Sequence, residues 1–195
     1  MRIEKSTMPT VIPAIRDPEQ WTVLGEGTGG WAFLLGGRVD MVAEAVALLQ
    51  KRHWRVFVHI DMVKGITGDF EGLRFFHEFA APDGIISTHS HTVNNAVKLG
   101  ILAIQRIFLI DSQSVESGIA QVERGVADAI EVLPGILPEL ITMLFKRLKQ
   151  PLIAGGLITS ASQVEQALQA GALSVSTSSS DLLAGIKRSR LTPGK

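Results

Sequence analysis

The sequence predicts an α/β protein, a small TIM-like (β/α)8 barrel of parallel strands with short connections. Eight short apolar segments alternate with helical patterns, which is typical of βαβ units and a parallel sheet. None of these segments is followed by a dinucleotide-type glycine motif, which favours a closed barrel over a doubly wound sheet. With 195 residues the chain is shorter than the ~250 residues of a usual barrel. We expect one domain over 1–195, with an N-terminal extension at 1–9 and a flexible tail at 188–195.

The strands are predicted from short runs rich in Val, Ile, Leu and Ala, as expected of strands covered on both faces. In the long apolar run that begins at Leu102, we expect mainly the first half to be strand. The predicted strands are Thr10–Ile15, Trp31–Leu35, Arg55–Ile60, Gly84–Ser87, Leu102–Ile110, Asp128–Leu133, Pro151–Ala154 and Ala172–Ser176.

The helices are predicted from start signals and from apolar spacing. Ser112 can cap one helix, Pro138 suits the first turn of another, and Ser160 with Gln163 matches a capping box. Gly171 is a suitable C-terminal stop for the helix that starts at Ser160. A further helix is predicted from the apolar stripe Val42, Ala45, Val46 and Leu49, another is marked by Phe75, Phe76 and Phe79, and a short one is predicted at Asn94–Leu99.

Polar residues follow nearly every predicted strand, and in a barrel the carboxyl ends of all strands open on one mouth, where function gathers. Asp61 ends an apolar strand, where an unpaired carboxylate is costly to bury. Gln105 and Arg106 interrupt another strand, so alternation sends one inward and one outward. Glu131 either orients a ligand or pairs with Arg106 on the next strand. The candidate ligand-binding residues are Arg16, Asp61, Lys64, Ser87, Gln105, Arg106, Glu131, Gly135, Gly155, Gly156, Thr177, Ser178 and Ser179.

The last two strand ends have the character of a phosphate site. Gly155 and Gly156 lack side chains that would keep a ligand from the backbone, and Thr177–Ser179 offer N–H groups and hydroxyls one strand later. Two such turns side by side form the phosphate cradle of many TIM barrels. The loop Met62–Gly68 contains two glycines, and we expect it to fold over the mouth when a ligand binds.

Histidines do not form a convincing metal site. His59 lies mid-strand and is expected to pack or bond internally. His89 and His91 form an H-S-H near a strand end without a third ligand at a credible spacing. We therefore expect no metal and no cofactor.

Composition narrows the class of protein. The 19 Lys and Arg residues equal the 19 Asp and Glu residues, so no global charge favours nucleic acid. No Cys is present, no hydrophobic leader begins the chain, and no apolar run is long enough for a membrane span, so we expect a cytoplasmic protein without membrane contact. The sequence leaves a homo-oligomer open.

Basic residues gather near the starts of two strands, which maps them to the amino-terminal face of the barrel, opposite the mouth. Cations favour helix C-termini for electrostatic reasons alone, and a surface for RNA phosphates is the functional alternative. The candidate RNA-binding residues are Lys51, Arg52, Arg55, Lys146, Arg147 and Lys149.

Several blocks together resemble the glycerol-3-phosphate-responsive antiterminators (GlpP family), in order and over essentially the whole chain. They are VIPAIR at Val11–Arg16, HIDMVKGI at His59–Ile66, DGIIST at Asp83–Thr88, AIQRIFLID at Ala103–Asp111, IEVLPGILP at Ile130–Pro138 and IAGGLI at Ile153–Ile158. His89 and the glycine-rich segment Trp21–Trp31 depart from the family pattern.

The resemblance implies a TIM-like barrel that senses glycerol 3-phosphate and binds the leader mRNA of a glycerol-catabolic operon to prevent premature termination. It implies a regulator and not an enzyme. The alternative is a small barrel enzyme, an isomerase or aldolase acting on a phosphorylated polyol or sugar. In that case Asp61 or Glu131 would act as acid and base, or Lys64 as an imine-forming amine.

Overall fold

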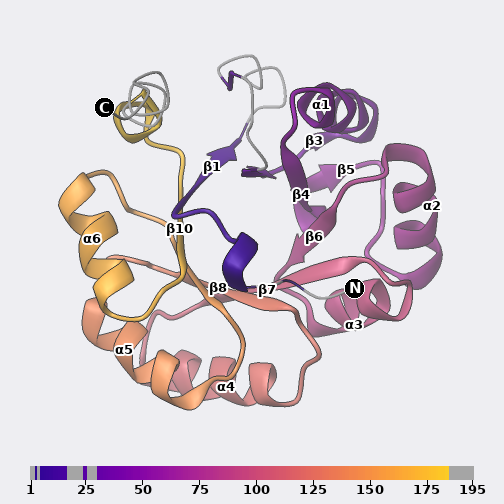
Figure 1. Cartoon of the computed structure of the whole chain (residues 1–195). Helices are drawn as coiled ribbons and strands as arrows, with labels where there is room; N and C mark the ends of the chain where they lie inside the picture. The colour runs from indigo at the N-terminus through magenta and orange to yellow at the C-terminus, as the bar shows by residue number, and fades with distance from the viewer. Residues whose placement is uncertain (1–2, 4, 17–23, 26–29, 185–195) are drawn as a thin grey trace.

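A computed structural model describes residues 3, 5–16, 24–25 and 30–184. Its eight main strands are all parallel and form a closed barrel in the order β1-β10-β9-β8-β7-β6-β4-β2. Helices surround this ring of strands (Figure 1). The predicted TIM-like (β/α)8 fold is therefore confirmed. The proposed tail at 188–195 and most of the segment Trp21–Trp31 lie outside the described residues.

The strands agree closely with the apolar runs that predicted them. The long run from Leu102 is strand for seven residues, which is more than its first half. The barrel strands are β1 (Val11–Ile15), β2 (Trp31–Leu34), β4 (Arg55–His59), β6 (Gly84–Ser87), β7 (Leu102–Phe108), β8 (Ala129–Leu133), β9 (Leu152–Gly155) and β10 (Ser174–Thr177).

The helices follow the strands as predicted, with two corrections. Asp111 and not Ser112 caps α4, because its carboxylate accepts from the N–H of Ser114 while the Ser114 hydroxyl bonds back to the Asp111 N–H. The helix expected at Asn94 begins four residues earlier, at Ser90. The helices are α1 (Val39–Lys51), α2 (Phe70–Ala80), α3 (Ser90–Lys98), α4 (Ser112–Glu123), α5 (Pro138–Arg147) and α6 (Ala161–Gln169).

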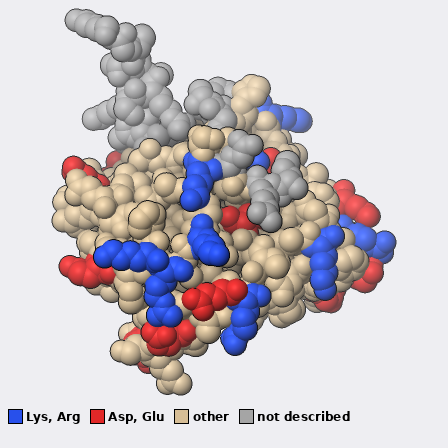
Figure 2. Space-filling view, turned by 60° about the horizontal axis from the view of Figure 1, so that its bottom comes forward, with Lys and Arg blue, Asp and Glu red and all other residues tan. Residues whose placement is uncertain are grey.

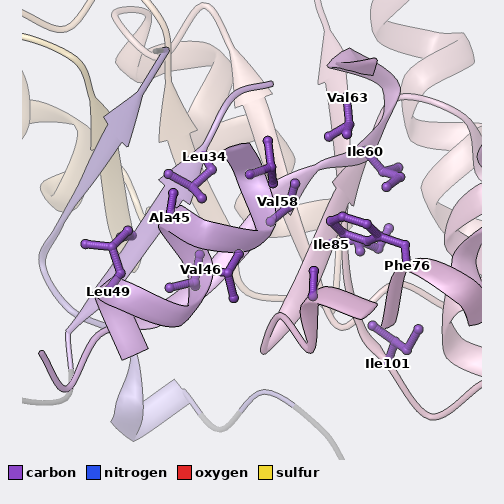
Figure 3. Close-up of a cluster of buried hydrophobic side chains, with 14 of the residues drawn as sticks. Leu34, Ala45, Val46, Leu49, Val58, Ile60, Val63, Phe76, Ile85 and Ile101 are labelled. Carbon is purple, nitrogen blue, oxygen red and sulfur yellow. The ribbon is translucent and has the colours of Figure 1, made fainter. Parts of the chain in front are cut away.

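Side-chain alternation divides the apolar core into an inner and an outer part. The apolar side chains of the barrel interior come from every strand except β10 and include Phe33, Phe57 and Ile104. The other face of the strands packs on the helices. Figure 3 shows part of this outer layer, where Leu34 and Val58 meet Val46 of α1. A second outer cluster lies under α4, α5 and α6.

The predicted N-terminal extension is part of the core. A short helical turn, η1 (Lys5–Thr7), lies across the middle of the ring of strands (Figure 1). Ile3 is buried among the interior side chains and Met8 packs against them. The start of the chain therefore closes the amino-terminal end of the barrel, and the mouth is its open end.

A small second sheet joins two loops at the mouth. Strand β3 (Gly37–Arg38) pairs in parallel with strand β5 (Val63–Lys64). Strand β5 follows the 3-10 turn η3 (Ile60–Met62). Gly36 has φ +129°, and a Cβ there would lie 2.7 Å from the carbonyl oxygen of Met62. Part of the loop Met62–Gly68 is thus tied to the loop before α1.

Candidate functional site

The inner face of the barrel becomes polar near the mouth. Arg106 on β7 and Glu131 on β8 are neighbours in register, and Arg106 Nε donates to Glu131 Oε2 over 2.6 Å. The other oxygen, Oε1, accepts from Ser176 Oγ on β10 at 2.5 Å. Arg106 is 7% exposed and Glu131 1%. Sequence analysis left a pair with Arg106 open for Glu131, and the structure confirms it.

The terminal nitrogens of Arg106 are the unused donors of this layer. Within the described part of the chain, the side-chain hydrogen bond of Arg106 uses Nε alone. Gln105 points to the other face of β7 and donates to the carbonyl oxygen of Ser87. Alternation therefore works as predicted, although both side chains are buried. A guanidinium held by a carboxylate and open at its fork is suited to an oxyanion or a hydroxyl.

Gly155 adjoins the polar layer formed by Glu131 and Ser176. A Cβ at Gly155 would lie 2.6 Å from both Glu131 Oε1 and Ser176 Oγ. The missing side chain thus makes room for the polar layer. Gly135 is similar, because a Cβ there would lie 2.7 Å from the nitrogen of Gly155. Its own N–H donates to the Gly155 carbonyl oxygen at 2.6 Å.

The corners after β9 and β10 still offer N–H groups, although fewer than predicted. Thr177 Oγ1 donates to the Ile158 carbonyl oxygen and accepts from the Ser179 N–H, so both groups are used internally. Gly156, with φ +76°, turns the chain away from the barrel. No described residue accepts a hydrogen bond from the N–H of Gly156, Leu157 or Ser178. These two corners are adjacent because Gly155 pairs with Ser176.

Asp61 holds the next corner of the mouth together. Its carboxylate accepts from Ser87 Oγ at 2.6 Å, from the Thr88 N–H at 2.7 Å and from Thr88 Oγ1 at 2.8 Å. Burial acts to raise the pKa of Asp61, but these hydrogen bonds outweigh it, so the pKa is lowered. Asp61 and Ser87 are therefore engaged with each other, and Asp61 is an anion that orders the β6–α3 corner.

Arg16 and Lys64 lie further out. Arg16 is exposed just beyond the end of β1, which pairs with β10. Lys64 is exposed in the β3–β5 sheet, in register with Arg38 and outside the barrel interior. Arg38 in turn forms an ion pair with Asp40. Neither Arg16 nor Lys64 reaches the Arg106 layer by a hydrogen bond to a described residue.

Sequence analysis missed two residues of this layer, His59 and Ser176. His59 is 3% exposed and its Nδ1 has no hydrogen-bond partner. Burial and then the positive charge of Arg106 lower the pKa of His59 to about 4. The signal that could have found it is alternation, because Phe57 and His59 share the inner face of β4. The same alternation places Ser176 on the inner face of β10, two residues before Ser178 at the mouth.

The described residues contain no group of three His, Asp or Glu side chains that could hold a metal ion. His89 and His91 have ring centroids 5.5 Å apart, without a third ligand. No helix in the described ranges is long and apolar enough to cross a membrane.

The basic residues expected to bind RNA do not form one patch. Those of α1 and of α5 lie on opposite sides of the barrel (Figure 1). Arg52 donates to the Leu24 carbonyl oxygen, Arg55 lies 3.8 Å from Asp83, and Arg147 lies 3.3 Å from Glu116. The remaining candidates Lys51, Lys146 and Lys149 are exposed. On the face shown in Figure 2, basic and acidic side chains are intermixed.

Comparisons with known proteins agree with this fold. A family model described as "Glycerol-3-phosphate responsive antiterminator" matches residues 11–183. The glycerol uptake operon antiterminator regulatory protein of Listeria monocytogenes str. 4b F2365 is 35% identical, with a TM-score of 0.85 over 90% of this chain and 95% of that one. An antiterminator-related protein of Thermotoga maritima MSB8 is 30% identical, with a TM-score of 0.79 over 91% and 99%.

More distant similarities extend to a curated protein and to enzymes. The uncharacterized Escherichia coli (strain K12) protein YgcP is 29% identical over 167 residues, which are 86% of this chain and 87% of that one. Barrel enzymes such as N-(5'-phosphoribosyl)anthranilate isomerase from Pyrococcus furiosus are 13% identical with a TM-score of 0.63, which shows a shared fold alone. The chain belongs to the family of glycerol-3-phosphate responsive antiterminators.

Proposed function

We propose that this protein is a transcription antiterminator that binds glycerol 3-phosphate in the barrel mouth and the leader mRNA of a glycerol-catabolic operon. The observation that carries the ligand half of the proposal is the junction of two features. Unbonded N–H groups of Gly156, Leu157 and Ser178 lie at adjacent strand ends. The Glu131–Ser176 contact fills the space directly in front of Gly155. An anion-binding corner therefore adjoins a hydrogen-bonding layer.

In this proposal the phosphate lies on the amides of the β9 and β10 corners, as in many barrels of this kind. The three-carbon chain extends toward Arg106, Glu131 and Ser176. Arg16 adds positive charge from the end of β1. Asp61 and Ser87 act indirectly by holding the neighbouring corner, because their polar atoms already bond to each other.

Calorimetry tests the ligand with three compounds: glycerol 3-phosphate, glycerol and inorganic phosphate. Hydrogen bonds to a charged group contribute about 1.5–3 kcal/mol each. Two amide contacts should therefore make glycerol 3-phosphate bind roughly a hundredfold more tightly than glycerol. Inorganic phosphate should bind more weakly than glycerol 3-phosphate, because it lacks the carbon chain. Equal affinities for glycerol and glycerol 3-phosphate would refute the phosphate corner.

The RNA half of the proposal rests on the family and on the six basic residues of the amino-terminal face. A gel shift with leader RNA, with and without glycerol 3-phosphate, tests it. The cleanest variants are the exposed lysines Lys51→Ala and Lys146→Ala/Lys149→Ala, since Arg52 and Arg147 contact other parts of the chain. Because the two groups lie on opposite sides, we expect one of them to weaken binding and the other to serve as its control. Normal binding by both variants would place the RNA site elsewhere.

The enzyme alternative receives less support from the geometry. Both oxygens of Glu131 are hydrogen-bonded, and Asp61 accepts three hydrogen bonds, so neither is a free base. Lys64 is exposed outside the barrel interior, where an imine would not be shielded from water. Borohydride trapping and turnover assays with triose and pentose phosphates test this alternative. Turnover at an enzymatic rate would replace the regulator proposal.

A further inference from the structure

His59 is an unsatisfied polar group in the most polar part of the barrel interior. Three buried side-chain atoms among the described residues lack a partner: Trp31 Nε1, His59 Nδ1 and Asn94 Oδ1. Trp31 begins β2 near the closed end and Asn94 lies in α3. His59 alone ends a strand on its inner face, at the mouth. A buried polar atom without a partner costs about 1–3 kcal/mol, so its retention there calls for a partner from outside the described residues.

Burial and the positive charge of Arg106 keep His59 uncharged, although Asp61 acts in the opposite direction. Arg106 on β7, Asp61 in η3 and His89 at the start of α3 are the charged or titratable side chains that act on it. The charge of Arg106 is balanced by Glu131, and Asp61 is bonded to Ser87 and Thr88. With a pKa of about 4, caused mainly by burial, the imidazole is neutral near pH 7. A neutral imidazole can donate one hydrogen bond or accept one, which matches a hydroxyl group.

The order of strands places His59 and the phosphate corner at the two ends of one polar arc. From β4 the barrel continues through β6, β7, β8 and β9 to β10. His59 lies on β4, Arg106 and Glu131 on β7 and β8, and the unbonded amides after β9 and β10. A ligand with its phosphate on those amides and its chain directed past Arg106 and Glu131 would point toward His59.

We infer that His59 binds the hydroxyl end of a polyol phosphomonoester and is a specificity-determining residue of this site. The inference rests on the proposed function and assigns to His59 a role that sequence analysis gave to packing. The layer between the two ends has no net charge, because Arg106 and Glu131 compensate each other. It therefore fits a ligand whose second end is an uncharged polyol and not a second acid.

Calorimetry on full-length wild type and His59→Leu, each with glycerol 3-phosphate and with n-propyl phosphate, tests this inference. The second compound has the phosphate and the three carbons but no hydroxyl. We expect His59→Leu to bind glycerol 3-phosphate about tenfold more weakly, since one buried hydrogen bond is lost. Its affinity for n-propyl phosphate should stay within about twofold of wild type.

Two further variants identify the nitrogen and protect the test against misfolding. Asn retains a polar atom near the position of Nδ1, and Gln retains one near Nε2. If Nδ1 is the contact, His59→Asn should keep most of the affinity for glycerol 3-phosphate and His59→Gln should lose it. Thermal unfolding without ligand should show His59→Leu to be at least as stable as wild type, because an unpaired polar atom has been removed. Marked destabilisation of all three variants would indicate a structural role and overturn the inference.

The outcomes separate this inference from the proposed function. Wild-type binding to glycerol 3-phosphate with an equal loss for both ligands in His59→Leu, or no loss for either, refutes the inference alone. Absence of wild-type binding to glycerol 3-phosphate refutes the proposed function and this inference with it.

Discussion

At the scale of single residues, the site depends on one buried ion pair. Arg106 and Glu131 are almost fully buried and 2.6 Å apart, and Ser176 satisfies the second carboxylate oxygen. Such a pair is costly to desolvate, and its value lies in orienting the guanidinium. The pair thereby presents the terminal nitrogens of Arg106 to the mouth.

Removing either Arg106 or Glu131 alone should therefore destabilise the protein more than removing both. We expect Glu131→Leu to lower the free energy of unfolding by about 3–5 kcal/mol, because it leaves Arg106 buried and unpaired. Arg106→Met/Glu131→Leu should lose much less. Urea unfolding of the two single variants and the double variant measures this cycle. Additive losses would show that the two side chains are not coupled.

His59 should make stability depend on pH. Its pKa is about 4 in the fold and 6.5 when unperturbed. The unfolded chain thus binds more protons between these values, and stability rises with pH across that window. The part of the free energy of unfolding that depends on neutral His59 is fully present above about pH 6.5 and is lost as the pH falls toward 4. A pKa shift of this size corresponds to a change of about 3 kcal/mol in the free energy of unfolding.

Urea unfolding of wild type and His59→Leu from pH 4 to 7 checks this expectation. The variant should show a shallower fall, with the difference confined to that window. Asp61 does not mask this difference: the charge of His59 contributes to its lowered pKa, but that pKa is lowered from 3.8 and lies below the window. Parallel curves would show that His59 is solvated and titrates normally.

At the scale of elements, the mouth is shaped by the β3–β5 sheet. It ties the loop before α1 to the loop after β4, and Gly36 is the position that lets the two backbones meet. Gly36 has φ +129°, and an added Cβ would lie only 2.7 Å from the Met62 carbonyl oxygen. The position therefore has no room for a side chain.

We expect Gly36→Ala to separate β3 from β5 while leaving the barrel folded. Hydrogen exchange at residues 63–64 should speed up, and exchange in β7 and β8 should stay unchanged. Gly25→Ala is the matched control, because nothing lies within 4 Å of a Cβ there. Slow exchange at 63–64 in Gly36→Ala would mean that the small sheet tolerates the added methyl group.

At the scale of the whole molecule, one interior connects the two halves of the barrel. The outer clusters are separate, one under α1–α3 and one under α4–α6. The interior cluster joins residues of both halves. Within it, the ring centroids of Phe57 and Trp31 lie 4.6 Å apart, and Phe57 packs against Gly84. This arrangement favours one cooperative domain.

Phe57→Ala should consequently destabilise the entire barrel, by about 3–5 kcal/mol. Fluorescence and hydrogen exchange should report the same transition for strands β1–β6 and for β7–β10. A variant that unfolds in two steps, with the β7–β10 half surviving, would show two domains instead. Val164→Ala, in the outer cluster alone, is the comparison and should cost less because Val164 is partly exposed at 9%.

The sequence alone determined the architecture and led to an expected place for the site. Local apolar runs, helix caps and polar strand ends depend on neighbouring residues, so the alternation of strands and helices, the capping box at Ser160 and the mouth at the carboxyl ends could be predicted from it. The family resemblance added the ligand class, and the family match supports it.

Only the tertiary structure decided which polar groups at the mouth are free. Asp61 and Thr177 use side-chain oxygens in hydrogen bonds to other corners of the barrel, and Glu131 and Ser176 fill the space beside Gly155. His59 has no such contact and remains unpartnered. The tertiary structure also decided the place of Ile3, which packs in the barrel interior although its segment was expected to be an extension. Hydrogen-bond satisfaction and burial depend on residues far apart in the chain, and these meet only when the barrel closes.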